Sequence, residues 1–502
     1  MDDIANVLMA HGPSRSSLIA ELLQEQHGLN PDAARKRLSR IVKPVVRFPI
    51  PLLPKREAFL YRLVDRNTER FWTNFLRDLR ETNSVYGAAI DGMLARGGIV
   101  LKEDFPVISG APVAQKGQVS ADRVASQLID AGFMTSFDLP DSCYAITGAG
   151  PTVGTTTRRA RALAEGVLLD ALREWTRKTG FASYNSIAIR GDARSRQVGP
   201  FVWDLTGPSY ILPLRNGDAQ PGFLVADVFA DGTLDEFHIK YFIRKARMSK
   251  ASLKGMGIFP ILLADSFTST ALTEGHKAGI VMVTHETLFG VRVAESMRNL
   301  LKTLNNAAAM VSGYPERLEE YIRELSSIEG KAGNLRGILF HLLSAHLLRR
   351  STVSIDIGKN AFDEKTGKHA DIDIIGVTEQ SAGCVLIECK GKQPGGIVEV
   401  DEVQDWLRRI PIFNAYIQSQ PTLREADRRF ELWTSGIFSA DALALLANEK
   451  IQRTRLPIDW KDGQAVLALA RAGKQKLIND TLFEHFLRHP LAEAASVLET
   501  AA

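Results

Sequence analysis

The stretch DIDIIGVTEQSAGCVLIECK, residues 371–390, decides the fold of the C-terminal part. Its two apolar segments flank a short polar connection, which predicts two neighbouring strands. Successive side chains on a strand point to opposite faces, so Glu388 and Lys390 project to the same side. Asp371 and Asp373 share a face of the preceding strand for the same reason. The tight connection between the strands would bring one of these aspartates beside Glu388.

Carboxylates at the end of an apolar strand need compensation, because burying a charge without a partner is unfavourable. Asp373 and Glu388, with a backbone carbonyl, can hold one hard cation such as Mg²⁺, and Mn²⁺ should substitute for it. Lys390 would lie beside that ion, where it can orient or deprotonate an attacking water. The metal itself lowers the pKa of the water and stabilises the transition state at phosphorus. A plainer alternative makes Glu388 and Lys390 a surface ion pair on an edge strand.

The neighbouring segments predict an alternating α/β domain. In chain order we expect a helix over 333–348, strands over 353–357, 371–377 and 384–390, a helix over 398–418, a strand over 430–434 and a helix from 440. In this order, Asp373 followed by Glu388-Cys389-Lys390 resembles the PD-(D/E)XK nuclease superfamily and its restriction-endonuclease and Mrr-like members. The resemblance covers about 170 residues, Gly333 to Ala502.

The resemblance implies catalytic roles for Asp373, Glu388 and Lys390. Gln404 matches a glutamine that is often found in the next helix of such enzymes, where it positions water or phosphate. In many relatives the first helix supplies a glutamate to the metal, and His341 stands at the comparable place. A neutral imidazole can hold a metal or its water, although histidine prefers softer ions than Mg²⁺. A structural histidine with no ligand is an equal alternative.

The middle of the chain repeats this pattern, which indicates a duplication. A long helix from Arg158 to Lys178 contains Glu165, a predicted strand 201–204 ends in Asp204, and the strand 222–229 contains Asp227. These three acids occupy the places of a second metal site. Position 229 is Phe, however, where the family has Lys. We therefore expect a degenerate copy that holds DNA or forms a dimer, with phosphate contacts from the basic helix 238–250.

The basic charge of the chain is concentrated near its N-terminus. The net charge is +4 over 502 residues, whereas residues 31–70 contain eleven basic and four acidic residues, a local charge of +7. Between Ser14 and Leu63, two short helices and a proline-punctuated hairpin resemble a winged helix-turn-helix, a fold that reads the major groove. The predicted DNA-facing cations are Arg35, Lys36, Arg37, Arg40, Arg47, Lys55 and Arg56. The alternative is a solvated basic helix without a ligand.

Other classes of protein are disfavoured by composition. The sequence contains no apolar run long enough to span a bilayer, and its start lacks the pattern of a signal peptide, so we expect a cytoplasmic protein without a membrane partner. Its three cysteines are too few and too scattered for a disulfide framework or a thiolate zinc site, and we expect them in strands or cores.

These inferences give one overall hypothesis. We expect a multidomain α/β chain with a winged-helix domain over 1–65, a helical or second winged-helix-like module over 66–150, a degenerate nuclease-like domain over 151–315 and a catalytic domain over 316–502. The function expected is a Mg²⁺-dependent endonuclease of the restriction or phage-defence type, acting on double-stranded DNA as a homodimer, with other defence proteins as possible partners. The alternative is a non-catalytic DNA-binding regulator or scaffold; RNA, a modified base or a damaged end is a third possible target.

Overall fold

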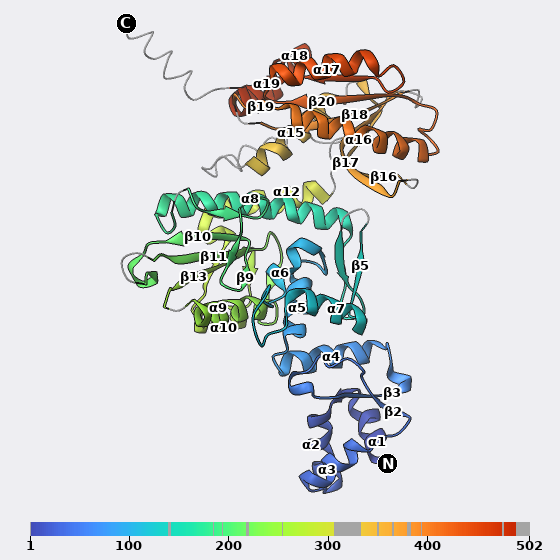
Figure 1. Cartoon of the computed structure of the whole chain (residues 1–502), viewed down its shortest axis with the longest axis vertical. Helices are drawn as coiled ribbons and strands as arrows, with labels where there is room; N and C mark the ends of the chain where they lie inside the picture. Colours follow the sequence, from blue (N-terminus) through green and yellow to red (C-terminus); the bar gives the residue numbers. More distant parts are fainter. Residues whose placement is uncertain are drawn as a thin grey trace. The chain divides into compact units, whose positions relative to one another are not determined.

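The computed structural model shows a multidomain α/β protein with mixed sheets (Figure 1). It describes residues 2–138, 142–183, 185–192, 194–216, 220–253, 255–305, 333–348, 351–363, 366–378, 383–392, 394–473 and 476–487. The chain divides into two compact units, Met1–Glu165 with Leu172–Ala294 and Gly166–Ala171 with Glu295–Ala502. The predicted boundaries at residues 65, 150 and 315 stay predictions. In the described part of the chain, no helix is both long and apolar enough to cross a membrane.

The first unit begins with a small helical bundle on a three-stranded antiparallel sheet of order β1-β3-β2. Its elements are α1 (Asp2–His11), β1 (Ser14–Arg15), α2 (Ser16–His27), α3 (Pro31–Ser39), β2 (Val45–Arg47) and β3 (Phe59–Arg62). The two expected helices and the hairpin are therefore present. The Asn30 side chain accepts a hydrogen bond from the Ala33 N–H and Pro31 opens the first turn, so α3 begins where the sequence predicts.

The next segment packs on the hairpin through aromatic rings. It contains α4 (Glu69–Glu81), α5 (Val85–Ala95), β4 (Ile99–Leu101), α6 (Phe105–Ile108), α7 (Ala121–Ala131), β5 (Met134–Phe137) and β6 (Cys143–Ile146). Phe75 on α4 stacks on Phe59 of β3, with ring centroids 3.9 Å apart, and lies 5.2 Å from Phe133. One apolar core therefore continues from the hairpin through α4 to the sheet of order β4-β6-β5 and onward into the middle of the chain.

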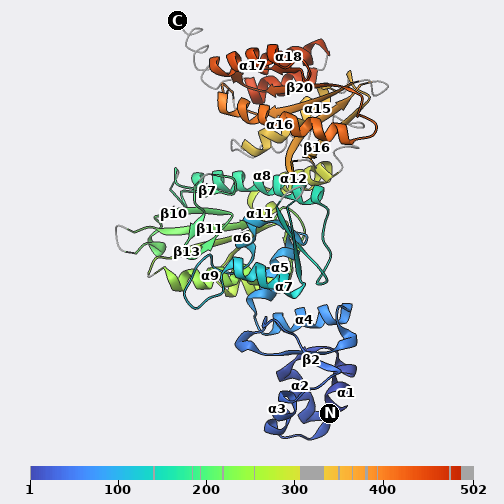
Figure 2. The ribbon, with the colours of Figure 1, turned by 45° about the vertical axis from the view of Figure 1, so that its right-hand side comes forward.

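The middle of the chain is built on a five-stranded sheet of order β15-β13-β11-β10-β7. Its elements are α8 (Thr155–Thr179), β7 (Ala188–Ile189), β8 (Gln197–Val198), β9 (Phe201–Val202), β10 (Leu205–Ser209), β11 (Gly222–Val228), β12 (Thr233–Leu234), α9 (Lys240–Ser252), β13 (Ile258–Ala264), β14 (Ser266–Phe267), α10 (Ser269–Lys277), β15 (Val281–Thr284), α11 (His285–Phe289) and α12 (Val291–Asn305). Helix α8 lies over one face of the sheet and α9 with α10 over the other (Figures 1 and 2).

One strand of this sheet differs from the prediction. The expected strand 201–204 is only the two-residue β9, which pairs with β8 outside the main sheet, and the strand of the main sheet is β10, one residue after Asp204. Thr206-Gly207-Pro208 reads as a turn in sequence. In the fold Gly207 allows close packing, because a Cβ there would lie 3.0 Å from the Cβ of Ala182. Tertiary packing thus overrides a local turn signal.

The C-terminal unit has a second five-stranded sheet, of order β16-β17-β18-β20-β22. Its elements are α15 (Gly333–Leu348), β16 (Ser354–Asp363), β17 (Lys368–Val377), β18 (Gly383–Lys390), β19 (Ile397–Val398), α16 (Val400–Ser419), β20 (Asp427–Thr434), β21 (Ile437–Phe438), α17 (Ala440–Gln452), β22 (Ile458–Lys461), α18 (Gly463–Ala472) and α19 (Lys476–Leu482). Side chains of α16 and α17 cover one face, and those of α15, α18 and α19 cover the other. Some predicted apolar positions of α15, Leu335, Ile338, Leu339 and Leu342, lie outside the described side chains.

The two five-stranded sheets share strand order and direction. In each sheet two antiparallel pairings are followed by two parallel ones, with β7, β10, β11, β13 and β15 corresponding in order to β16, β17, β18, β20 and β22. Each sheet is accompanied by a short parallel pair, β12 with β14 and β19 with β21. The two halves thus agree in topology, as the duplication in the sequence predicts.

Candidate active site

Asp373 and Glu388 lie on neighbouring strands, just beyond the point where the pairing of β17 with β18 ends. The last recorded pair of this antiparallel ladder is Ile374 with Ile387, and the next residues outward on the two strands are Asp373 and Glu388. An Asp373 carboxylate oxygen accepts a hydrogen bond of 2.7 Å from the Cys389 backbone N–H. The predicted proximity of an aspartate to Glu388 is therefore met by Asp373, whereas Asp371 is exposed two residues earlier.

Glu388 is buried and only half of its carboxylate is neutralised. Its side chain is 5% exposed, and Oε1 accepts from Lys390 Nζ at 3.0 Å and from Arg409 Nη2 at 2.6 Å. The other oxygen, Oε2, is buried without a hydrogen-bond partner. A buried carboxylate oxygen without a partner is unfavourable, so this oxygen fits a role as a ligand. The strand β18 is central, with β17 on one side and β20 on the other, so the alternative of an exposed edge strand is wrong.

Electrostatics at Asp373 favour a positive group between the two acids. Burial raises the pKa of Asp373, the charge of Glu388 raises it further, and the nearby imidazole of His341 opposes the shift. A divalent cation would favour the ionised form of both carboxylates. The two acids and the carbonyl between Glu388 and Lys390 are oxygen donors of the type that Mg²⁺ prefers.

His341 also belongs to this site. It extends from α15, and its Nε2 lies 3.4 Å from Asp373 Oδ2. The His341, Asp373 and Cys389 side chains place one potential ligand atom each within 4.8 Å of one another. The structure thus brings together five side chains from one helix and two strands: His341, Asp373, Glu388, Cys389 and Lys390.

The contact that α16 makes with Glu388 comes from Arg409 and not from the predicted Gln404. Gln404 lies on α16, but its side chain is exposed and no contact among the described residues connects it to Glu388. Arg409, five residues later, supplies the contact from this helix. The sequence signal for Arg409 is its place beside Ile410, on the flank of the apolar stripe that packs α16 on the sheet. A flanking cation of this kind can extend back over the strand ends, which motif matching does not reveal.

The acids of the middle sheet occupy the same positions in its ladder. The last recorded pair is Leu205 with Ala226, so Asp204 and Asp227 come next, as Asp373 and Glu388 do. An Asp204 oxygen accepts from the Val228 N–H at 3.1 Å, which repeats the bond between Asp373 and Cys389. Asp227 accepts in turn from the Asp204 N–H at 3.0 Å. The backbone therefore presents the two pairs of acids in the same manner.

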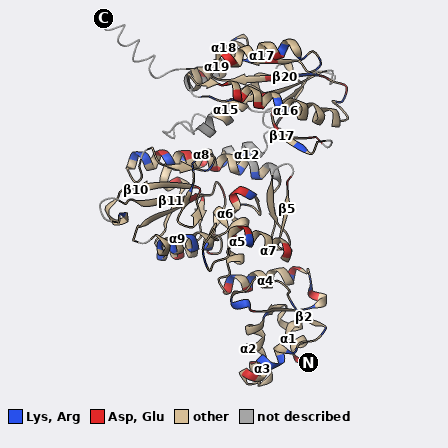
Figure 3. Ribbon diagram, viewed as in Figure 1, with Lys and Arg blue, Asp and Glu red and all other residues tan. Residues whose placement is uncertain are grey.

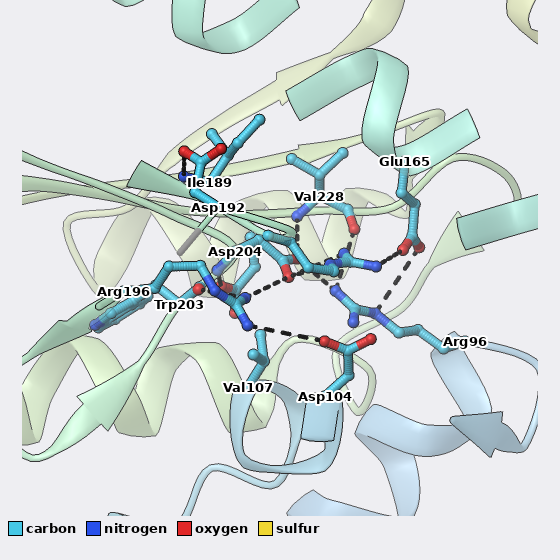
Figure 4. A network of polar contacts seen from close by, with 12 residues as sticks. Arg96, Asp104, Val107, Glu165, Ile189, Asp192, Arg196, Trp203, Asp204 and Val228 are labelled. Carbon is cyan, nitrogen blue, oxygen red and sulfur yellow. Dashed lines mark hydrogen bonds and ion pairs between the residues drawn. The ribbon is translucent and has the colours of Figure 1, made fainter. Parts of the chain in front are cut away.

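Basic side chains fill the middle site (Figure 4). Asp204 is fully buried and contacts Arg96 at 2.5 Å and Arg190 at 2.9 Å. Glu165 on α8 accepts from Arg190 at 2.7 Å, and its other oxygen lies 3.8 Å from Arg96. Burial raises the pKa of Asp204, but the surrounding guanidinium groups more than offset this and hold it below its usual range. These contacts use the oxygens that a metal would need.

Lys245 also occupies the middle site, and its burial excludes this one residue from the predicted phosphate contacts of the basic helix. Lys245 on α9 is fully buried, with Nζ 2.6 Å from Asp227 and 2.8 Å from the carbonyl of Val107. Arg244 donates to the Gly110 carbonyl at 3.1 Å. Lys245 and Arg244 therefore pack inward, whereas Arg247 and Lys250 of the predicted phosphate-binding helix are exposed. Phe229 is buried where the other sheet has Lys390, and the guanidinium of Arg96 lies 5.2 Å from its ring centre.

The seven predicted DNA-facing cations of the first domain are all exposed. Figure 3 marks basic residues along α3. Arg47 donates to the Leu38 carbonyl at 2.8 Å and so also satisfies the end of α3. Arg37 pairs with Asp3, and Arg35 lies 3.9 Å from Asp32. Lys55 and Arg56 lie in the short 3-10 helix Pro54–Arg56 between β2 and β3.

Comparison with known proteins adds little to these observations. No protein-family model matches the sequence, and no curated protein matches it. Among solved structures, the chain is similar to the crystal structure of a repair endonuclease from Pyrococcus abyssi, at 17% sequence identity and a TM-score of 0.14. The match spans 21% of this chain and 38% of that chain, well under half of the endonuclease. A likeness this slight carries no argument about fold or function.

Proposed function

We propose that the chain is a metal-dependent endonuclease of the PD-(D/E)XK type that hydrolyses phosphodiester bonds in double-stranded DNA. The C-terminal unit carries the catalytic site, and the first domain is a winged helix that engages the duplex. The observation that carries the proposal is the carboxylate of Glu388. It is buried, has one oxygen neutralised by Lys390 and Arg409 and the other without a partner, and lies next to Asp373 in the ladder.

Asp373 and Glu388 would hold the cation, with Mg²⁺ as the expected ion and Mn²⁺ as a substitute. Such an ion supplies an activated water and stabilises the charge that develops on the phosphate. The protein holds the two carboxylates in place from both sides. The Cys389 N–H fixes Asp373, and Lys390 with Arg409 fixes Oε1 of Glu388. Oε2 of Glu388 would then bind the cation.

Lys390 has a second task in this proposal. Its side chain is 27% exposed while its ammonium remains 3.0 Å from Glu388, so it can contact a substrate phosphate without leaving the site. An ammonium there stabilises the negative charge that builds on the non-bridging oxygens during attack by water. The water loses its proton to solvent or to a neighbouring group, and the leaving 3′ or 5′ oxygen takes up a proton to end as a hydroxyl. Gln404 remains a candidate for positioning water or phosphate from α16.

Support for DNA as the substrate comes from the first domain. The order helix, strand, helix, helix and hairpin, with an exposed basic α3, supports the winged-helix part of the proposal. Cations on the β2–β3 loop would contact phosphates, which position a protein without specifying sequence. Because one site cuts one strand, cleavage of both strands requires two sites, which favours a homodimer.

The test is a nicking assay with purified full-length protein, supercoiled plasmid and Mg²⁺. Wild-type protein should nick the plasmid, and the variant Asp373→Ala plus Lys390→Ala should not. Equal nicking by both proteins, or nicking by neither on DNA, RNA or damaged ends, sinks the enzyme proposal. The second outcome, with retained duplex binding, would instead identify a DNA-binding scaffold.

A further inference from the structure

A second cluster of potential ligands lies on the other face of β18 from Glu388. It consists of His341 Nε2 from α15, a carboxylate oxygen of Asp373 from β17 and the Cys389 thiol from β18, all within 4.8 Å of one another. Cys389 belongs to the apolar cluster on the α15 side of the sheet, whereas Glu388 is bonded to Arg409 of α16. The cluster is therefore distinct from the carboxylate pair and shares only Asp373 with it.

The donor set does not suit Mg²⁺. It offers one nitrogen, one oxygen and one sulfur, whereas Mg²⁺ prefers six oxygens in octahedral geometry and keeps several waters. Imidazole and thiolate are the ligands of borderline and soft divalent ions, among them Zn²⁺ and Co²⁺. A set of three protein ligands with a fourth, open position is common for Zn²⁺ in catalytic sites.

The distances are close to those of a bound ion. Metal–ligand bonds of about 2.0–2.3 Å at tetrahedral angles separate the ligand atoms by about 3.3–3.8 Å. His341 Nε2 and Asp373 Oδ2 are 3.4 Å apart. The Cys389 sulfur lies within 4.8 Å of both atoms. Rotation of the Cys389 side chain would bring the sulfur to the distance required, since the other two atoms are already in place.

Burial also fits an ion that enters from solvent. The side chains of His341 and Asp373 are 30% and 18% exposed, while Cys389 is 5% exposed as a residue. Solvent thus reaches the nitrogen and oxygen ligands first, and the sulfur lies deeper. The Cys389 N–H holds Asp373 by a 2.7 Å hydrogen bond, which orients this ligand as hydrogen bonds around metal sites do.

We propose that His341, Asp373 and Cys389 form a thiolate-containing site for a nitrogen- and sulfur-preferring divalent ion such as Zn²⁺. The inference shares Asp373 and its neighbour His341 with the proposed nuclease site but does not depend on cleavage. An ion here would also pull Asp373 toward α15, so its presence should weaken binding of Mg²⁺ between Asp373 and Glu388. The two cations would then compete for the Asp373 carboxylate.

The test is titration of reduced full-length protein with Co²⁺, followed by absorption spectroscopy. Cobalt bound by a thiolate gives a sulfur-to-metal charge-transfer band in the near ultraviolet and strong visible bands when tetrahedral. We expect one thiolate band per chain and its displacement by one equivalent of Zn²⁺. In excess Mg²⁺ the band should still form, but at higher Co²⁺ concentration, because the two ions compete for Asp373. Absence of the band in the wild-type protein would overturn the proposal.

Matched variants assign the sulfur. Cys384→Ser changes the other buried cysteine of β18, which faces the α16 side, and it should keep the band. Cys389→Ser should lose it, and a band of equal strength in this variant would also overturn the proposal. His341→Gln alters a partly exposed side chain outside the core, so it should fold and reduce affinity for Co²⁺ at least about tenfold, in line with the loss of one metal-site group. Nicking in Mg²⁺ without the band would leave the nuclease proposal standing alone, and the band without nicking would do the reverse.

Discussion

The middle and C-terminal sheets present acids in the same way and surround them differently. In both, two carboxylates follow the last pair of an antiparallel ladder, and the first accepts a hydrogen bond from the N–H after the second. Both second acids also pair with a cation from the following helix, Lys245 in one and Arg409 in the other.

The difference lies in groups that come from outside the strands. Arg96 and Arg190 reach the middle acids, and Phe229 replaces the strand lysine, so each carboxylate oxygen is used internally. In the C-terminal sheet one oxygen of Glu388 is without a partner and Asp373 is partly exposed. The shared strand arrangement therefore does not decide whether a pair of carboxylates can bind a metal or only stabilises the fold. The side chains that reach the pair from other elements decide it.

The largest expected effect separates the two acid pairs by activity. Asp373→Asn should lower plasmid nicking at least about 100-fold, roughly 3 kcal/mol of transition-state stabilisation, because it removes a charged ligand. Asp204→Asn, at the same ladder position in the middle sheet, should leave the rate per folded molecule within about twofold. The measurement is a nicking time course normalised to folded protein by circular dichroism. A comparable loss in Asp204→Asn would mean that the middle site also acts.

For stability, we expect the ion pairs of the middle acids to matter most. Lys245→Met leaves Asp227 buried without its cation and should lower the free energy of unfolding by about 3–5 kcal/mol. The double variant Asp227→Asn plus Lys245→Met should recover part of that loss, because no uncompensated charge remains. Urea denaturation followed by tryptophan fluorescence measures both. No recovery in the double variant would show that packing of Lys245, rather than its charge, matters.

Acid sensitivity should trace to Asp204. Its pKa in the folded state is held below the unfolded value of about 3.9, because Arg190 and Arg96 outweigh the effect of burial. A lowered folded pKa contributes stability that is complete above the unfolded pKa and is lost as the pH falls toward the folded pKa. Between pH 5 and pH 3 the wild-type protein should therefore lose stability more steeply than Asp204→Asn. Parallel urea midpoints across this pH range would contradict the assignment.

The smallest expected effect concerns exposed lysines of α3 and α10. Lys36→Ala on α3 should weaken duplex binding for all sequences and reduce the slope of log affinity against log salt by about 1. Lys277→Ala, an exposed lysine of α10 paired with Glu274, should leave the slope unchanged. Fluorescence anisotropy with a labelled duplex at several salt concentrations measures the slopes. Equal slopes for the wild type and Lys36→Ala would remove α3 from the DNA-binding surface.

The sequence by itself predicted most helices and strands of the C-terminal sheet in their order, because apolar periodicity and turn signals are local. In the middle sheet it predicted β11 but neither β7 nor β10. It placed Asp373 and Glu388 on adjacent strands, located Lys390 beside them and anticipated the loss of the second lysine at Phe229. It was wrong about the strand of Asp204, where the Gly207-Pro208 turn signal yielded to close packing against Ala182.

Only the tertiary structure decided which side chains surround each acid pair. Arg96 lies 108 residues before Asp204, and Arg409 lies 21 residues after Glu388, with no local pattern that connects either pair. Long flexible cations can reach partners across elements, and whether they point inward depends on packing that no spacing rule records. The sequence placed His341 near Asp373 through the family resemblance, but no local pattern indicated that the Cys389 thiol would approach them. Strand pattern set the carboxylates in place, and long-range packing determined their charge environment.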